Sequence, residues 1–347
     1  MCIRDSQGPG TDAASVALIR KAVDEGRECV VELLNYHKDG TPFWNRLSIT
    51  PVLDEGGRVT HFIGLQSDIS ARRKAEEALR SANRQLHHAN RRMAQNLEMA
   101  SRIQRAFLPR HDTEIDGVTF AWQLRPCDEL AGDTINFAPL DDRHVEVYSI
   151  DVSGHGVAAA LLSVTLNHLL SPEGGRLVLA DPDHEVAAGT GIMAPTAVAE
   201  TLNRQFPFDP DRNQFFTIAY GVYDVRDRQF RFVSAGHPPP ILVPRSGEPR
   251  YEQAQGTPIG VDPDAVYREN VLQLTAGDRV YLYSDGLIDV LDHREEPYDV
   301  ERLARTLAGL RHETLSASLN AALEDVERWG RNRPLADDVS ILAFEAR

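Results

Sequence analysis

Hydrophobic and polar residues alternate in three runs near the N-terminus. The runs cover residues 29–35, 43–53 and 59–67. Alternation with a period of two is typical of strands that bury one face. Turn-forming residues at 38–40 and 54–57 separate the runs, which predicts two successive β-hairpins. Residues 12–25 have helical spacing and predict a helix before the first strand.

A second pattern lies between residues 71 and 108, where apolar positions recur in alternating steps of four and three. The stripe consists of Ala75, Leu79, Ala82, Leu86, Ala89, Met93, Asn96, Ala100, Ile103 and Phe107. No Gly or Pro occurs in this range before Pro109. Four-three spacing over several heptads predicts a parallel, dimeric coiled coil, with Asn96 as the one polar position in the seam. The alternative is a single amphipathic helix that lies on the following domain.

Strand patterns dominate the rest of the chain, with helical patterns between them. Strands are predicted at residues 119–124, 145–152, 215–225, 229–234, 267–274, 279–284 and 339–344, and helices at 157–170, 197–205, 300–310 and 315–329. Residues 171–195 are rich in Gly, Pro, Asp and Ala and are expected to form a surface loop. This order of elements predicts an α+β fold.

Composition and charge exclude several classes of protein. The 347 residues are 42% apolar and 26% charged, as in ordinary globular proteins, with neither a signal peptide nor a membrane span. Three cysteines do not make a disulfide framework, so a cytoplasmic protein is expected. The net charge of −15 disfavours nucleic acid as the main partner. Residues 71–110 carry ten Lys and Arg against three acids, which we interpret as a solvated helix face.

Candidate chemistry comes from Asp residues at the ends of predicted strands. Asp133 follows Gly132, Asp285 precedes Gly286, and Asp151 lies three residues before Gly154, whereas Asp337 precedes the last strand together with Asp338. Carboxylates that converge from different strands repel one another unless a cation lies between them. Oxygen ligands select hard ions such as Mg²⁺ or Mn²⁺, and a pair of such ions can activate water for attack on phosphorus.

Each of these residues also has an ordinary structural interpretation. A single Asp at a strand end is most often a turn or a helix cap. His155 and His237 have neither a cysteine nor a second histidine at zinc spacing, so each alone is expected to be a structural loop residue.

Taken together, the motifs resemble those of the SpoIIE-type branch of the metal-dependent protein phosphatases (the PPM family). The matching segments are Gly132-Asp133, Asp151-Val152-Ser153-Gly154-His155-Gly156, Ala235-Gly236-His237-Pro238-Pro239, Gly256-Thr257-Pro258-Ile259-Gly260, Gly277-Asp278, Ser284-Asp285-Gly286, Asp337-Asp338-Val339-Ser340 and a lead-in stretch at 103–109. They keep the order found in the family and span about 250 residues. The resemblance implies a β-sandwich of two antiparallel sheets flanked by helices, with phosphoserine/phosphothreonine hydrolase activity.

The same resemblance implies site roles, cofactors and a partner. Asp151 would bridge two Mn²⁺ or Mg²⁺ ions, the Val152 carbonyl would bind one ion, and Asp285 and Asp337 would bind on the other side. Asp133 would act on the metal sphere directly or through water. Gly154, His155 and Gly156 would shape the loop over the site. The implied substrate is a phosphorylated STAS-type antagonist of an anti-sigma factor, and water would attack without a covalent phospho-enzyme.

Two departures from the family pattern leave an alternative open. Ala131 occupies the position of a usual Gly, and Asn136 occupies a position that is often Asp. If Asn136 weakens metal binding, the chain is a catalytically inactive, dimeric partner-binding module. A nucleotide enzyme is disfavoured, because no phosphate-binding Gly-rich loop with Lys occurs.

The N-terminal region resembles the second half of a LOV domain, the flavin-binding branch of the PAS sensors. The matching segments are Gln7-Gly8-Pro9-Gly10-Thr11-Asp12, residues 34–45 and residues 62–68. The resemblance implies that Asn35, Asn45 and Gln66 bind FMN through their amides. The first strands and the adduct-forming Cys are missing, and Ile3 occupies the position of that Cys. FMN is therefore expected only in a longer parent protein.

These observations predict three parts and a route of regulation. Residues 1–70 are expected to be a partial sensor, 71–108 a coiled-coil transmitter that makes a homodimer, and 109–347 the phosphatase domain. A packing change in the sensor would rotate or re-register the helix and move the loops that carry the predicted metal ligands.

Overall fold

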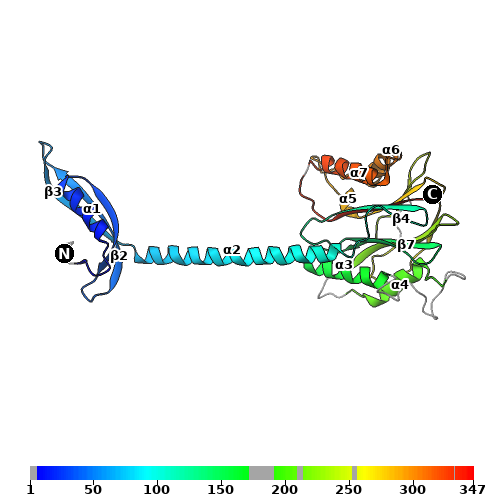
Figure 1. Cartoon of the computed structure of the whole chain (residues 1–347), viewed down its shortest axis with the longest axis horizontal. Coiled ribbons are helices and arrows are strands. Elements are labelled where there is room, and N and C mark those ends of the chain that lie inside the picture. The colour runs from blue at the N-terminus through cyan, green and yellow to red at the C-terminus, as the bar shows by residue number, and fades with distance from the viewer. Residues whose placement is uncertain (1–5, 172–190, 209–213, 252–255, 332) are drawn as a thin grey trace. The chain divides into compact units, whose positions relative to one another are not determined.

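The computed structural model describes residues 6–171, 191–208, 214–251, 256–331 and 333–347. It divides into two compact units, residues 1–94 and 95–347, and the boundary falls within helix α2, Ser70–Arg105 (Figure 1). The division into three parts stays a prediction. Most of the predicted loop at 171–195, and the Ile3 position, lie outside the described residues.

The first unit is a three-stranded antiparallel sheet with one helix. Its elements are α1 (Ala13–Asp24), β1 (Cys29–Tyr36), β2 (Pro42–Leu53) and β3 (Val59–Asp68), with strand order β1-β2-β3. Asp12 caps α1 by accepting hydrogen bonds from the backbone of Ala14 and Ser15. The core is small and consists of Ile19, Leu33, Leu47 and Ile49.

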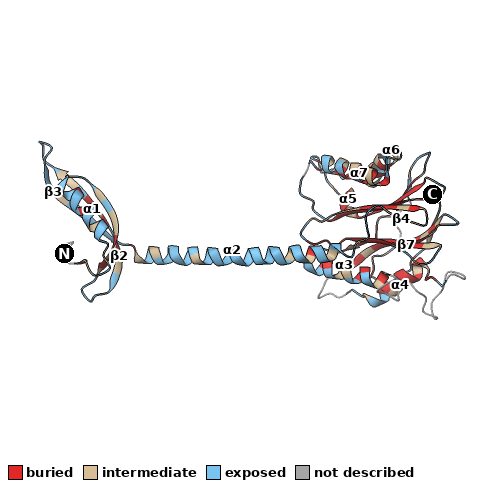
Figure 2. Cartoon of the chain, viewed as in Figure 1, coloured by how far each residue is buried: buried red, intermediate tan, exposed pale blue. Residues whose placement is uncertain are grey.

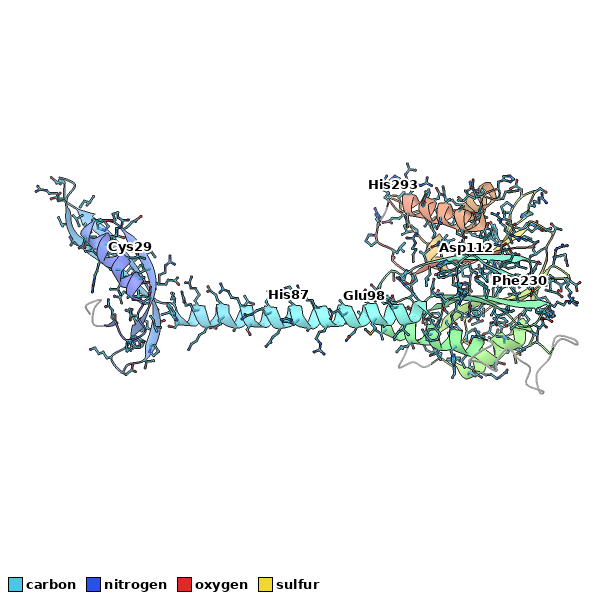
Figure 3. All side chains as sticks on the ribbon, in the orientation of Figure 1. Cys29, His87, Glu98, Asp112, Phe230 and His293 are labelled. Carbon is cyan, nitrogen blue, oxygen red and sulfur yellow. The ribbon has the colours of Figure 1, made fainter. Side chains whose placement is uncertain are left out.

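Helix α2 is continuous over 36 residues, as the absence of Gly and Pro predicts. Figure 2 shows it exposed along most of its length, and side chains such as His87 and Glu98 project freely from it (Figure 3). The large seam residues Leu79, Leu86, Met93, Ile103 and Phe107 are all exposed. Within this chain, the apolar seam therefore has no partner among the described residues.

The second unit contains two antiparallel sheets. The first has the order β11-β10-β13-β14-β5-β4 and the second β12-β9-β8-β7-β6. The strands of the first are β4 (Thr113–Ile115), β5 (Val118–Arg125), β10 (Ile241–Val243), β11 (Arg250–Tyr251), β13 (Arg279–Tyr283) and β14 (Val339–Glu345). Those of the second are β6 (Thr134–Pro139), β7 (His144–Val152), β8 (Phe216–Asp224), β9 (Gln229–Ala235) and β12 (Asn270–Gln273).

Helices cover the outer faces of both sheets, so the unit has four layers (Figure 1). Helices α3 (Val157–Leu170) and α4 (Pro195–Gln205) pack on the second sheet, and α6 (Val300–Gly309) and α7 (Leu315–Trp329) on the first. The short helix α5 (Asp285–Ile288) follows β13. One hydrophobic core lies between each sheet and its helices, and a third core, which includes Phe230, fills the space between the two sheets.

The period of two assigns each strand residue to one of these cores. In β14, Leu342 and Phe344 point between the sheets, whereas Ile341 and Ala343 face the helices. The strand is buried on both faces, which explains why its residues 341–344 form a continuous apolar run rather than an alternating one. The same alternation of faces decides on which side of its strand each predicted metal-binding Asp lies.

The structure confirms the predicted fold class and corrects its details. The short strands β4, β6, β10 and β11 and helix α5 were not predicted. Strand β6 is short: the polar residues Thr134 and Asn136 alternate with Ile135 and Phe137 over only four residues, so its strand pattern is weak. Among the described residues, no helix is long and apolar enough to cross a membrane.

Candidate metal centre

Asp133 and Asp151 lie at neighbouring ends of β6 and β7. Thr134 pairs with Ile150, so the two Asp residues flank the end of this ladder. Asp133 shares its face with Ile135, and Asp151 shares its face with Val147; both of these residues belong to the core between the sheets. The two carboxylates therefore point between the sheets.

The first sheet contributes Asp285 and Asp337 from the opposite side. Asp285 begins α5 directly after β13, and Asp337 precedes β14, which pairs with β13. Gly286 lies so close to Asp338 that an added Cβ would meet its carbonyl oxygen at 2.1 Å and Asp337 Cβ at 3.3 Å. Only Gly permits this contact, which brings the two acidic segments together.

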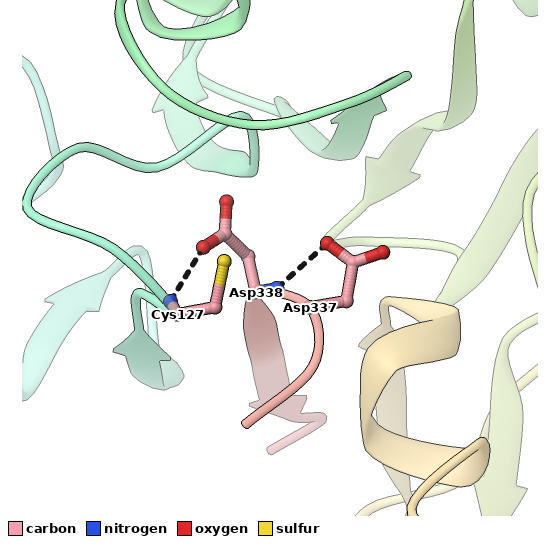
Figure 4. A group of neighbouring side chains, drawn as sticks. All are labelled: Cys127, Asp337 and Asp338. Carbon is pink, nitrogen blue, oxygen red and sulfur yellow. Dashed lines mark hydrogen bonds between the residues drawn. The ribbon is translucent and has the colours of Figure 1, made fainter. Parts of the chain in front are cut away.

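Asp338 organises the loop that carries Asp133. Its carboxylate is 3% exposed and accepts backbone hydrogen bonds from Cys127 (2.8 Å), Gly132 (2.6 Å) and Asp133 (3.3 Å). Figure 4 shows Asp338 beside Cys127, with an oxygen of Asp337 accepting a hydrogen bond from the Asp338 backbone. Asp337 is exposed, whereas Asp338 is buried. The sequence motif contained Asp338, but the predicted site did not assign it a role. Its fully buried carboxylate is what ties β14 to the Asp133 loop.

Crowding of the carboxylates changes their protonation. Burial, followed by repulsion from Asp285 and Asp337, raises the pKa of Asp151 to about 7. Burial and the charge of Asp151 raise the pKa of Asp133 well above its usual range, and burial raises that of Asp285. These shifts show that acidic residues from both sheets meet in one place.

The donor set fits a hard divalent cation. Asp133 Oδ2 is buried and makes no hydrogen bond of normal geometry, although the hydroxyls of Ser284 and Ser340 lower its pKa in part. Among the described residues, no Lys or Arg offsets the raised pKa of Asp151. Buried, mutually repelling carboxylate oxygens of this kind are suited to Mg²⁺ or Mn²⁺.

The loop around these residues is closely packed. An added Cβ on Gly132 would lie 2.9 Å from the Val152 carbonyl oxygen, so Gly132 lets that carbonyl approach the Asp133 loop. The role of Val152 as a metal ligand stays a prediction. His155 lies after β7 and contacts Asp128 at 2.7 Å, with both side chains exposed.

Asn136 lies on the opposite face of β6 from Asp133. Its amide donates to the Tyr148 hydroxyl (3.2 Å) and lies 3.4 Å from Asn167 Oδ1 on α3. Residues 133 and 136 point to opposite sides of the strand, about 10 Å apart along it. The replacement of Asp by Asn at this position therefore does not remove a charge from the acidic cluster.

Cys127 lies in a cluster with Asp337 and Asp338, but its thiol is expected to be unreactive. Ligand atoms of the three residues lie within 4.8 Å of one another. Burial and the negative charge of Asp338 raise the pKa of the thiol to about 12. The protonated thiol is a poor nucleophile and metal ligand at neutral pH.

The flavin-binding role of Asn35, Asn45 and Gln66 stays a prediction. Asn35 and Asn45 are buried, and Asn35 donates to Ser6 Oγ at 2.6 Å, whereas Gln66 is exposed. Asn35 Oδ1 and both amide atoms of Asn45 make no hydrogen bond with the described residues. Asn35 and Asn45 lie on the same face of the sheet as the core residues Leu33 and Leu47.

A four-layer sandwich with an acidic centre between its sheets defines a protein of the PP2C fold class. The solved SiaA-PP2C domain of Pseudomonas aeruginosa superposes with a TM-score of 0.59 and 23% identity, covering 74% of this chain and 98% of that domain. The chain belongs to the family described as Stage II sporulation protein E (SpoIIE), whose model matches residues 141–347, more than half of the chain.

Two curated relatives are similar to parts of this chain. The phosphoserine phosphatase RsbP of Bacillus subtilis (strain 168) is 26% identical over 231 residues, which are 62% of this chain and 53% of RsbP. Phototropin-2 of Oryza sativa subsp. japonica is 58% identical over 64 residues, 18% of this chain and 7% of phototropin-2. Residues 3–71 match the PAS domain model. The chain thus spans about half the length of RsbP and a small part of phototropin-2.

Proposed function

We propose that this chain hydrolyses phosphoserine or phosphothreonine on a partner protein with the help of two Mn²⁺ or Mg²⁺ ions. The observation that carries the proposal is the convergence of acidic side chains from two sheets, where burial and repulsion raise the pKa of Asp151 to about 7. Family membership and the name of RsbP as a phosphoserine phosphatase support the same activity.

Each residue then has a role that follows from its position. Asp151, Asp285 and Asp337 hold the ions, and Asp133 binds at the ion sphere directly or through water. When bound, the ions polarise a phosphoryl oxygen and help to deprotonate the attacking water. Asp338 holds the Asp133 loop through backbone hydrogen bonds. Gly132 and Gly286 permit the close backbone contacts.

The partner and the regulation extend this proposal. A phosphorylated STAS-type antagonist of an anti-sigma factor is the substrate that the family resemblance suggests, and the PAS region would control its dephosphorylation. The α2 seam would form a homodimer. Gln104 on α2 hydrogen-bonds both the carbonyl (2.6 Å) and the N–H (3.1 Å) of Ala131, two residues before Asp133. A rotation of α2 would therefore move the Asp133 loop.

Hydrolysis of p-nitrophenyl phosphate with added Mn²⁺ tests the proposed activity. We expect Asp151→Asn and Asp285→Asn to lose at least about 100-fold in kcat/KM, because each removes a ligand charge. Asp142→Asn, an exposed residue of the β6–β7 turn, is the matched control and should keep wild-type activity. A wild-type protein with no more Mn²⁺-dependent activity than Asp151→Asn would instead support the inactive partner-binding module.

A further inference from the structure

His237 is a fully buried histidine without a role in the proposed reaction. It lies in the connection from β9 to β10, which crosses from one sheet to the other, and is 0% exposed. Its Nδ1 lies 2.7 Å from Thr217 Oγ1. Burial lowers the pKa of the ring to about 3, so the imidazole is neutral at neutral pH.

Thr217 is the direct neighbour of Asp151. The two residues are paired across β8 and β7. Directly opposed residues of an antiparallel pair point to the same face, with their Cβ atoms about 5 Å apart. The Thr217 side chain therefore lies beside the Asp151 carboxylate, and His237 holds the Thr217 hydroxyl.

The ring also lies near the segment that carries Asp285. The backbone of Tyr283 partly offsets the lowered pKa of His237, and the buried Nε2 makes no hydrogen bond of normal geometry. Tyr283 ends β13, two residues before Asp285. One ring thus contacts the neighbours of two predicted ligands that come from different sheets.

Two segments of the family pattern keep this ring in place. Gly236 N–H donates to the Gly256 carbonyl at 3.1 Å, and an added Cβ on Gly236 would lie 2.5 Å from Pro258 Cγ. On β8, Ile218 bridges to Gly236, and Phe216 bridges to Ile259. Residues 235–239 and 256–260 therefore pack against each other and against β8, which restricts the motion of the imidazole ring.

We propose that His237 is a positioning residue that sets the separation of Asp151 and Asp285, and with it the affinity of the centre for divalent cations. The inference rests on the proposed function and deepens it. With its proton on Nε2, the ring accepts the Thr217 hydroxyl proton at Nδ1. That arrangement fixes the Thr217 rotamer and keeps its proton off the Asp151 oxygens, which stay available to the ions.

Calorimetric titration of the full chain with Mn²⁺ tests this role without any activity measurement. We expect His237→Leu and Thr217→Val to weaken Mn²⁺ binding at least about tenfold, a typical effect of removing an outer partner of a metal ligand. His237→Asn, whose amide can replace Nδ1, and Thr217→Ser should stay within about threefold of wild type. Tyr220→Phe is the matched control, since it removes a buried hydroxyl from the other face of the same strand, where it contacts Glu146.

The outcomes separate this inference from the proposed activity. Wild-type Mn²⁺ affinity in Thr217→Val, or an equal loss in His237→Asn and His237→Leu, overturns the positioning role. Thr217→Val keeps the test valid if His237→Leu does not fold. If the wild type binds Mn²⁺ but hydrolyses no phosphate ester, the proposed activity fails while the positioning role is still measured. Absence of Mn²⁺ binding by the wild type overturns both.

Discussion

Two adjacent Asp residues differ in burial and in the groups that they bind. Asp338 is buried and accepts three backbone hydrogen bonds, whereas Asp337 is exposed and accepts one from the backbone of Asp338. A buried acceptor of several N–H groups contributes to stability, because its loss leaves those donors unsatisfied. The exposed carboxylate of Asp337, beside other acids, is the one that we propose for ion binding.

Substitution separates these two roles. Asp338→Asn places an amide N–H against backbone donors, and we expect it to lower the free energy of unfolding by about 1–3 kcal/mol. Asp337→Asn should change that free energy by less than about 0.5 kcal/mol but weaken Mn²⁺ binding. Urea denaturation without metal and Mn²⁺ titration measure the two effects. Equal loss of stability in both variants would contradict the assignment.

The raised pKa of Asp151 predicts how the metal-free protein responds to pH. Its folded-state pKa of about 7 lies above the ordinary value of 3.8, so the folded state binds the proton more tightly than the unfolded state. This contribution is fully present below about pH 4 and is lost as pH rises through about 7. We expect the metal-free Tm to fall between about pH 5 and pH 8.

Two comparisons check this pH dependence. Mn²⁺ should raise Tm more at about pH 8 than at about pH 5, because the cation replaces the proton between the carboxylates. Asp151→Asn has no proton to release and should show a shallower fall in its metal-free Tm. A slope identical to that of the wild type would mean that Asp151 does not carry the effect.

At the scale of elements, α2 carries two separate stripes near its C-terminal end. Leu97, Ser101 and Gln104 are buried or half-buried, and Gln104 bonds Ala131 and Ser163. The apolar seam lies beside this stripe and stays exposed at Ile103. One helix can therefore contact the catalytic unit and a second copy at the same time.

Disruption of the seam should change the oligomeric state. Leu86→Lys puts a charge into the proposed dimer interface, and we expect the full chain to become monomeric in sedimentation equilibrium while the wild type is a dimer. Arg84→Glu, a charge change at an exposed position outside the seam, is the matched control and should stay dimeric. A wild type that sediments as a monomer at high concentration would argue for the single amphipathic helix.

Loss of the Gln104 contact should affect the loop that it holds. In Gln104→Ala, the Ala131 backbone loses the two hydrogen bonds that Gln104 makes and keeps only that from Ser163 Oγ, so Asp133 is held less firmly. We expect weaker Mn²⁺ affinity and a lower kcat for p-nitrophenyl phosphate, with the helical content of the protein unchanged by circular dichroism. Unchanged Mn²⁺ affinity and kcat would show that α2 does not act on the site through this contact.

At the scale of the whole molecule, the two units have very different cores. Four residues form the hydrophobic core of the first unit, whereas three large clusters stabilise the second. A unit with so small a core buries little of its surface and is only marginally stable. We expect two transitions in scanning calorimetry of the full chain, the first from residues 1–94.

Mn²⁺ provides the check on this assignment. The four predicted metal ligands Asp133, Asp151, Asp285 and Asp337 all lie in the second unit. Mn²⁺ should therefore raise the temperature of the higher transition only. His237→Leu should reduce that increase and leave the lower transition unchanged. A single transition that shifts as a whole with Mn²⁺ would show that the two units unfold together.

The sequence by itself determined every feature that depends on local pattern. The steps of four and three determined α2, and the apolar runs determined strands such as β7 and β14. A strand-end Asp with a Gly directly after it, or three residues after it, located Asp285 and Asp151. The family motifs added the sandwich architecture. These features could be predicted because helical period, strand period and turn residues act between near neighbours in the chain.

Only the tertiary structure decided which of these residues face one another. Asp338 is buried beside the Asp133 loop, and Asn136 lies on the face of β6 away from the acidic centre. His237 contacts Thr217, the strand neighbour of Asp151. In each case strand pairing sets the face on which the residue lies. Shifting a strand by one residue would exchange its two faces. No local pattern contains that register, so it follows only from packing of the complete sheets.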